Sequence, residues 1–340
     1  MKTYYRPIPQ TDAARPPEAL TLAGGWCWFT HVECLTRGKA PRIAGVADLP
    51  QEALMHLIGT RADVAGLPMA TPQIMGILNV TPDSFSDGGQ FNGLDQAVDR
   101  TQAMIDQGAT IIDVGGESTR PGSGYVEVEA EIERTAPVIA AVAPKIDVPI
   151  SIDTRKAPVA AAALAAGATL VNDVSGFTFD AELGPLAAAK GAPVCIMHAQ
   201  GDPANMQDDP SYDDVLLDVY DFLEAQVSQL EALGLSRGQI VVDPGIGFGK
   251  TLTHNLALLA RISLFHSLGC PILLGASRKR FIGTIGNAPD TQDRVPGSLA
   301  VAMEGIAQGI QFVRVHDVAE TKQAFDLWQA VTTGVVNDGT

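Results

Sequence analysis

The sequence predicts a (β/α)8 barrel, classed as α/β, that is preceded by an N-terminal extension. From residue 73 onward, eight short apolar runs alternate with longer amphipathic stretches. The runs are continuously apolar, which is typical of parallel strands covered on both faces. Many of the amphipathic stretches end in glycine just before the next run, the usual end of a helix. An open doubly wound sheet is the competing architecture, but it normally contains fewer such units.

The expected barrel occupies residues 71–335. Its eight strands are expected at Ile74–Leu78, Thr110–Val114, Pro149–Ile152, Thr169–Val171, Pro193–Met197, Ile240–Val242, Pro271–Leu274 and Gln311–Val315. Helices are expected near residues 94–107, 126–143, 157–166, 181–190, 213–233, 255–268, 297–309 and 318–331.

Residues 1–70 do not follow this pattern. Aromatic and β-branched residues predict a strand within Trp26–Leu35, and Gln51–Ile58 is expected to form a short helix. We expect this extension to pack on the barrel or to cover its N-terminal end. An interface with a partner is the alternative.

Composition limits the classes of partner. Of 340 residues, 46% are apolar, which is enough for a large core, and the net charge is −16. Such an acidic chain is not expected to bind nucleic acid or an anionic membrane, because both need a surplus of basic residues. An anionic substrate would need the few basic residues gathered at its site. With scattered cysteines, no secretory signal and no apolar run of the ~20 residues a bilayer needs, we expect a cytoplasmic protein.

Polar side chains follow all eight expected strands, at the end where a barrel of this kind carries its active site. They are Asn79, Asp113, Asp153, Asn172 with Asp173, His198, Asp243, Ser277 through Lys279, and Arg314 with His316. Asp or Asn after a strand often caps the next helix, so capping is the alternative at single positions. It is a poor explanation for the whole set, because Lys279, Arg314 and His316 are not capping residues.

Eight motifs in order resemble the dihydropteroate synthase family of pterin-binding barrels. They are GILNVTPDSFSDGG (76–89), DVGGESTRPGS (113–123), SIDTRK (151–156), VNDVSG (171–176), MHAQGDPANMQ (197–207), DPGIGFGKT (243–251), SRKRFIG (277–283) and RVHDV (314–318). The resemblance covers about residues 73–331. It implies a transferase that joins a dihydropterin diphosphate to 4-aminobenzoate with loss of pyrophosphate. It also implies a homodimer.

A pterin ring presents adjacent donors and acceptors, for which carboxylate and amide side chains are fitting partners. The resemblance assigns to the pterin Asp153, Asn172, Val174, Met197, Asp243 and Lys279. For Met197, ordinary core packing is the alternative.

The leaving diphosphate requires cations. Arg314 and His316 are two residues apart on the last strand, so both can point into the barrel mouth. Asn79, on the first strand, could hold Mg²⁺ together with diphosphate oxygens, since this ion commonly takes one or two protein ligands. A structural salt bridge is the alternative for Arg314.

The resemblance assigns to 4-aminobenzoate Phe85, Thr119, Arg120, Pro121, Gly247, Phe248 and Ser277. Ser277 precedes a helical-looking stretch, and a helix N-terminus with a hydroxyl is a natural carboxylate site. Catalytic roles are implied for Asp87, Arg120 and Lys279. The loops after the first two strands are long and contain glycine, so we expect them to order when the diphosphate binds.

The same residues allow other interpretations. GIGFGKT resembles a phosphate-binding P-loop, but Pro244 stands where that motif needs glycine. A methyltetrahydrofolate-binding methyltransferase would share the pterin residues, but it would not need cations for a diphosphate. A metal-dependent amidohydrolase is disfavoured because the first strand lacks a His-x-His pair. A non-catalytic pterin-binding protein stays open, because only an assay separates it from a synthase.

Overall fold

A computed structural model of the chain describes residues 1–80, 89–118, 123–201 and 205–335. Eight parallel strands pair in the order β11-β10-β9-β8-β7-β6-β13-β12, and a parallel bridge between Val242 and Ile272 joins the two ends of this sheet. The predicted (β/α)8 barrel is confirmed. The strands are β6 (Gln73–Asn79), β7 (Ile111–Gly115), β8 (Ile150–Asp153), β9 (Leu170–Asp173), β10 (Val194–Met197), β11 (Ile240–Asp243), β12 (Leu273–Leu274) and β13 (Phe312–Val315).

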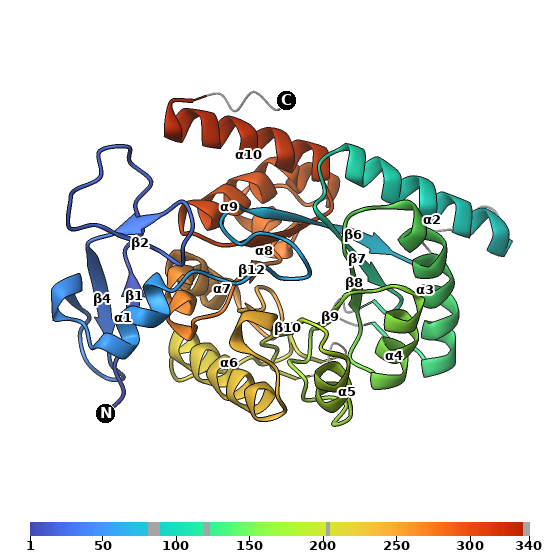
Figure 1. The fold of residues 1–340 in the computed structure, drawn as a ribbon, viewed down its shortest axis with the longest axis horizontal. Helices are drawn as coiled ribbons and strands as arrows, with labels where there is room; N and C mark the ends of the chain where they lie inside the picture. The colour runs from blue at the N-terminus through green and yellow to red at the C-terminus, as the bar shows by residue number, and fades with distance from the viewer. Residues whose placement is uncertain (81–88, 119–122, 202–204, 336–340) are drawn as a thin grey trace.

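Helices surround the strands (Figure 1). They are α2 (Gly89–Asp106), α3 (Val128–Val142), α4 (Ala157–Ala166), α5 (Leu183–Lys190), α6 (Val215–Ala232), α7 (Leu252–Ala260), α8 (Arg280–Ile285), α9 (Val295–Ala307) and α10 (Val318–Thr333). One expectation needs correction. The single helix expected near 255–268 is broken at Arg261 (φ −132°, ψ 27°), after which a 3-10 helix, η5 (Ile262–Leu268), follows. The helical-looking stretch after Ser277 forms the short helix α8, but it begins only at Arg280.

The barrel interior is filled rather than hollow. One buried cluster gathers side chains of the strands with Val64 and Met69, which come from the segment just before β6. Its strand members are Met75, Ile111, Leu170, Cys195, Val241, Leu273 and Phe312. A larger apolar cluster lies between the strands and the helices. Because both faces of the strands are buried in this way, their sequences are continuously apolar.

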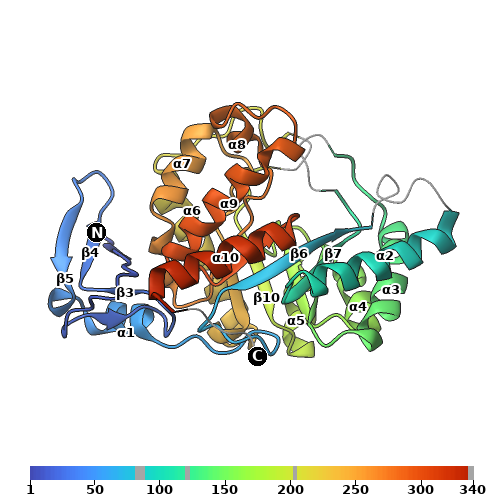
Figure 2. The same cartoon turned by 90° about the horizontal axis from the view of Figure 1, so that it is seen from above.

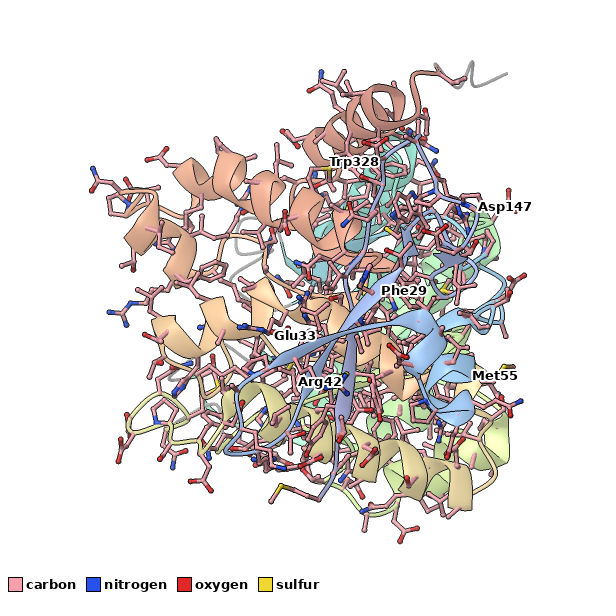
Figure 3. All side chains as sticks on the ribbon, turned by 90° about the vertical axis from the view of Figure 1, so that its left-hand side faces the viewer. Phe29, Glu33, Arg42, Met55, Asp147 and Trp328 are labelled. Atoms are coloured by element: carbon pink, nitrogen blue, oxygen red, sulfur yellow. The ribbon has the colours of Figure 1, made fainter. Side chains whose placement is uncertain are left out.

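The N-terminal extension forms a small sheet with its own apolar cluster. Strands β1 (Tyr4–Pro7), β4 (His31–Leu35) and β5 (Arg42–Gly45) are antiparallel in the order β1-β4-β5, and β2 (Leu20–Thr21) pairs with β3 (Trp28–Phe29). Helix α1 has the predicted bounds, Gln51–Ile58. The sheet lies beside α6 and α7 (Figures 1 and 3), at the opposite end of the molecule from α2 and α3 (Figure 2).

The extension is fastened to the barrel by several polar contacts. The Tyr4 hydroxyl donates to the carboxylate of Asp221 on α6 at 2.8 Å. The hydroxyl of Ser263 on η5 donates to the carbonyl of Pro7 at 3.0 Å, and the indole of Trp26 donates to a carbonyl of α9 at 2.8 Å. These contacts join the extension to the outer helices. No helix among the described residues is long and apolar enough to span a bilayer.

Candidate active site

Strand register gathers the predicted polar residues at one end of the barrel. Asn79 is the register partner of Gly115, Gly115 of Asp153, and Asp153 of Asn172, so these four positions are neighbours on β6, β7, β8 and β9. Residues in register on neighbouring strands point to the same face of a sheet. The sequence pattern therefore converges on one polar surface at the C-terminal ends of the strands.

Arg314 lies in the middle of this surface. Its Nε donates to Asp113 Oδ2 at 2.6 Å, and one Nη donates to Asp153 Oδ2 at 2.8 Å. The amide of Asn172 donates to the same Asp113 carboxylate at 3.3 Å. Asp113 is fully buried and had no assigned role in the sequence prediction, although it stands in one of the motifs. In this structure Arg314 therefore forms salt bridges, as the alternative to a diphosphate contact expected.

This cluster has one cation and two acids, because the Arg314 guanidinium pairs with both Asp113 and Asp153. Burial raises the pKa of Asp153 above its ordinary value, and the charge of Arg314 opposes this effect. Burial lowers the pKa of Arg314, but the charges of Asp113 and Asp153 outweigh it and raise the pKa above its usual range. The guanidinium therefore stays charged, and Asp153 is an acid that readily accepts a proton.

Asp243 ends β11 and fixes the start of a glycine-rich loop. Its carboxylate accepts from the amide of Gly245 at 2.7 Å, and burial raises its pKa. Gly245 has φ +68°, and a Cβ there would lie 1.9 Å from the carbonyl oxygen of His198. Only glycine allows this approach. The loop thereby holds Gly247 and Phe248 beside Lys279.

The amine of Lys279 is enclosed by the protein, near the charges of Asp243 and Arg314. Its Nζ donates to the carbonyl of Ile246 and lies 4.0 Å from the ring centroid of Phe248. Burial lowers the pKa of Lys279 to about 7, against the opposing charge of Asp243. A Cβ at Gly247 would lie 2.9 Å from Lys279 Cδ, so this glycine makes room for the lysine. Residues assigned to two different substrates are thus in direct contact.

Ser277 and His316 form a second contact between predicted subsites. Ser277 Oγ lies 3.0 Å from His316 Nδ1, and its oxygen accepts from the His316 amide at 3.2 Å. The expectation that Ser277 stands at a helix N-terminus is wrong, because α8 begins at Arg280 with Lys279 as the N-cap. The backbone bends sharply between the serine and the lysine, so the serine hydroxyl faces β13 instead.

That bend is made at Arg278, which has the left-handed backbone conformation (φ 57°) that is costly for a residue other than glycine. Two contacts hold it there. The Arg278 amide donates to Ser298 Oγ at 2.9 Å, and its Nε donates to Asp317 Oδ2 at 2.9 Å. The strained residue places its neighbours Ser277 and Lys279 at the mouth, each with a different partner.

Two strand-end residues serve the fold rather than the polar surface. His198 packs edge-on against Phe222 and lies 2.9 Å from Lys250 Nζ, and burial lowers its pKa to about 2. Asp173 accepts from the amides of Ser175 and Phe177, at 2.7 Å each. These bonds hold the turn after β9, and they do not cap the next helix, because α5 begins at Leu183 with Glu182 as its N-cap. Sequence reasoning missed Lys250, which stands in the string that resembles a P-loop.

The other predicted residues divide into two groups. Met197 is buried at 3% exposure on β10, where it is the register partner of Asp243, and Val174 is half-buried just after β9. The remaining predicted residues lie outside the described part of the chain, namely Phe85, Asp87, Thr119, Arg120 and Pro121.

The fold and the mouth define a class: a barrel enzyme with a site for a small polar ligand that needs both acids and cations. Residues 75–316 match the family model described as pterin binding enzyme. The dihydropteroate synthase of Escherichia coli K12 is 45% identical over 276 residues, which cover 81% of this chain and 97% of that relative. The chain belongs to the dihydropteroate synthase family, and it is a transferase.

Two solved structures of the Xanthomonas albilineans dihydropteroate synthase are similar to this chain. The structure with 4-aminobenzoic acid has a TM-score of 0.75 and 41% identity, covering 80% of this chain and 97% of the other. The complex with 7,8-dihydropteroate has a TM-score of 0.72 and 39% identity, covering 80% and 98%.

Proposed function

We propose that this chain condenses a 7,8-dihydropterin-6-ylmethyl diphosphate with 4-aminobenzoate to give 7,8-dihydropteroate and pyrophosphate, through dissociative loss of the pyrophosphate. The observation that carries the proposal is the placement of Arg314 between Asp113 and Asp153 at the barrel mouth. It joins a cation suited to a diphosphate with acids suited to a pterin. The relatives crystallised with 4-aminobenzoic acid and 7,8-dihydropteroate support the choice of substrates.

Pterin recognition is assigned to buried acids and an amide. The side chains of Asp153, Asn172 and Asp243 are nearly fully buried, so each must be paired when a ligand excludes water. Such a site favours a heterocycle with matching N–H groups and rejects analogues that lack them. Val174 and Met197 are proposed to pack on the ring faces, and Lys279 is proposed to donate to its acceptor edge.

Diphosphate recognition is assigned to Arg314 and His316. In the structure the guanidinium donates to both acids, Asp113 and Asp153. A pterin N–H that pairs with Asp153 leaves an Arg314 donor for a phosphate oxygen. Binding of the pterin and release of this donor are thereby coupled, which favours entry of the pterin diphosphate before the second substrate.

The chemistry breaks the bond between the pterin methylene carbon and the diphosphate oxygen, and the electron pair leaves with pyrophosphate. Positive charge then builds on the methylene carbon and is shared with the pterin ring. The lone pair of the aminobenzoate nitrogen forms the new C–N bond, and that nitrogen loses one proton to water. The charge of Asp113 stabilises the cation and Arg314 stabilises the departing anion, both fixed before the reaction.

Aminobenzoate is assigned to the wall formed by Gly247, Phe248 and Ser277, with Phe85, Thr119, Arg120 and Pro121 from outside the described residues. The ring of Phe248 offers an apolar face beside the amine of Lys279. The hydroxyl of Ser277 offers a donor for a carboxylate. Asp87, Arg120 and Lys279 keep the catalytic roles that the motifs imply.

Mg²⁺ is proposed to accompany the diphosphate. A Cβ at Gly115 would lie 3.8 Å from Asn79 Oδ1 and 3.7 Å from Asp153 Oδ2, so two oxygen donors flank the same glycine. Oxygen donors, few in number and completed by phosphates and water, suit this ion. Asn79 would hold it, and the ion would supply charge neutralisation of the leaving diphosphate.

We also propose a cytoplasmic homodimer. All four cysteines are free and buried, as expected in a reducing compartment. Dimerisation rests on the family resemblance, and sedimentation velocity would test it: a single monomeric species at micromolar concentration would contradict it.

The deciding experiment measures pyrophosphate release with each substrate alone and with both together. We expect release that depends on aminobenzoate, with dihydropteroate formed in equal amount. Pyrophosphate release that is indifferent to aminobenzoate would contradict the synthase. Pterin binding without any release would indicate a carrier instead.

A further inference from the structure

A buried lysine ties the end of β10 to the glycine-rich loop that follows β11, the neighbouring strand. Lys250 is 3% exposed. Its Nζ donates to the carbonyl of His198 at 3.1 Å and to the carbonyl of Phe248 at 3.0 Å, and it lies 2.9 Å from His198 Nδ1. Burying an amine so completely is costly unless its N–H groups are paired, and these contacts pair them.

A second side chain holds the next residue of the same loop. The Tyr212 hydroxyl donates to the carbonyl of Gly249 at 2.7 Å, and the centroid of its ring lies 5.9 Å from that of His198. Gly249 has φ +59°, and a Cβ there would lie 2.4 Å from the carbonyl oxygen of Gln200. Two consecutive loop carbonyls, those of Phe248 and Gly249, are thus held by side chains that lie beside His198.

The loop held in this way is in direct contact with the barrel mouth. The ring centroid of Phe248 lies 4.0 Å from Lys279 Nζ, which also donates to the carbonyl of Ile246. Phe248 therefore contacts Lys250 through its backbone and Lys279 through its ring. Because a carbonyl and the side chain of the same residue move together, the place of this ring depends on the bond to Lys250.

We propose that Lys250 and Tyr212 are positioning residues for the aminobenzoate site, an inference that rests on the proposed function. They act on the ring of Phe248 through the backbone of the loop. Without them the ring would have to be ordered when the ligand binds, which lowers affinity. The acids and the amide assigned to the pterin stand at the ends of strands β8, β9 and β11, so affinity for the pterin should change little.

The test compares Lys250→Met with Arg61→Met. Arg61 is a matched control, because it is also a buried basic side chain, 7% exposed, that donates to main-chain carbonyls. These are the carbonyls of His56 and Gly59 at 2.8 Å and of His266 at 2.9 Å, which lie where α1 meets η5. Both variants lose a buried basic group, and both should melt at a lower temperature.

The steady-state constants separate the two variants. Lys250→Met should raise the KM for aminobenzoate on the order of tenfold and leave the KM for the pterin diphosphate within about twofold. Tyr212→Phe removes a single hydroxyl, and it should raise the KM for aminobenzoate on the order of fivefold. Arg61→Met should change neither KM.

A double-mutant cycle shows whether Lys250 acts through Phe248. Phe248→Ala by itself should raise the KM for aminobenzoate, since it removes the ring. In that background Lys250→Met should raise the same KM by no more than about twofold, because two changes that act through one ring are not additive.

An unchanged aminobenzoate KM in folded Lys250→Met, an equal rise in both KM values, or full additivity with Phe248→Ala would overturn the proposal. If Lys250→Met does not fold, Tyr212→Phe takes its place, and a normal aminobenzoate KM there would also overturn it. Failure of the proposed function is a separate result, because it shows in the unmodified protein as pyrophosphate release that ignores aminobenzoate.

Discussion

The guanidinium of Arg314 donates to the carboxylate of Asp153 at 2.8 Å, and the two residues are 161 positions apart in the chain. One belongs to the predicted diphosphate subsite and the other to the predicted pterin subsite. Their contact couples the two subsites electrostatically. Whichever group pairs with Asp153 decides whether the Arg314 guanidinium is available to bind phosphate.

Arg314→Lys should lower turnover on the order of a hundredfold or more, because an ammonium cannot reproduce the planar fork that reaches Asp113 and Asp153 together. Initial rates of pyrophosphate release measure it. Arg37→Lys is the control: Arg37 also bridges two acids, Asp218 at 2.6 Å and Asp221 at 2.7 Å, but it lies on the N-terminal extension. Equal rates for the two variants would contradict the role of Arg314.

Pyrophosphate should raise the melting temperature of the pterin-bound enzyme, since a ligand that binds only the folded state stabilises it. At a concentration of 100 Kd the expected gain is about 2.7 kcal/mol in the free energy of unfolding. Differential scanning fluorimetry measures the shift, and Arg314→Lys should abolish most of it. The absence of any shift at saturating pyrophosphate would count against the anion site.

Lys279→Met should lower turnover on the order of a hundredfold, and it should also change how stability depends on pH. The folded pKa of Lys279, about 7, is below its unfolded value of 10.5. Between these values the unfolded chain binds more protons, so the contribution of Lys279 to stability rises with pH there and is least favourable below pH 7. Relative to the unmodified protein, Lys279→Met should therefore be most stable near pH 6 and lose this advantage towards pH 10.

Thermal melts of both proteins from pH 6 to pH 10 measure the difference. Lys322→Met, which removes an exposed lysine paired with Asp326, should show no such trend. If the difference in melting temperature between Lys279→Met and the unmodified protein does not change with pH, the pKa of Lys279 is not lowered by burial.

Gly245→Ala should unfold the loop or the protein, because its Cβ would meet the His198 carbonyl at 1.9 Å. Gly191→Ala is the matched control, since Gly191 also has a positive φ (+62°) but nothing lies within 4 Å of the added atom. The control should lose only the ~1–2 kcal/mol of a left-handed residue. Urea denaturation compares them, and similar midpoints would contradict the close approach at Gly245.

Much of the fold follows from local pattern. The eight continuous apolar runs and the glycines that end the helices predicted the barrel, and helix α4 has the predicted bounds, Ala157–Ala166. The break at Arg261 was not predicted. It lies in an apolar stretch, where the period of hydrophobic residues does not distinguish one helix from two.

The residues at the C-terminal mouth of the barrel could also be predicted from the sequence, because polar groups at strand ends converge in any barrel of this topology. The side chains with which these residues pair could not be predicted. Asp113 meets Arg314 across 201 positions, Lys156 meets Glu117, and Ser277 turns to His316 rather than to its own helix. The strand to which a residue belongs, and whether the residue lies at the end of that strand, are local properties that the hydrophobic period determines. Which charges touch is decided by strand register and barrel closure, and these bring together segments that have no local relationship in the sequence.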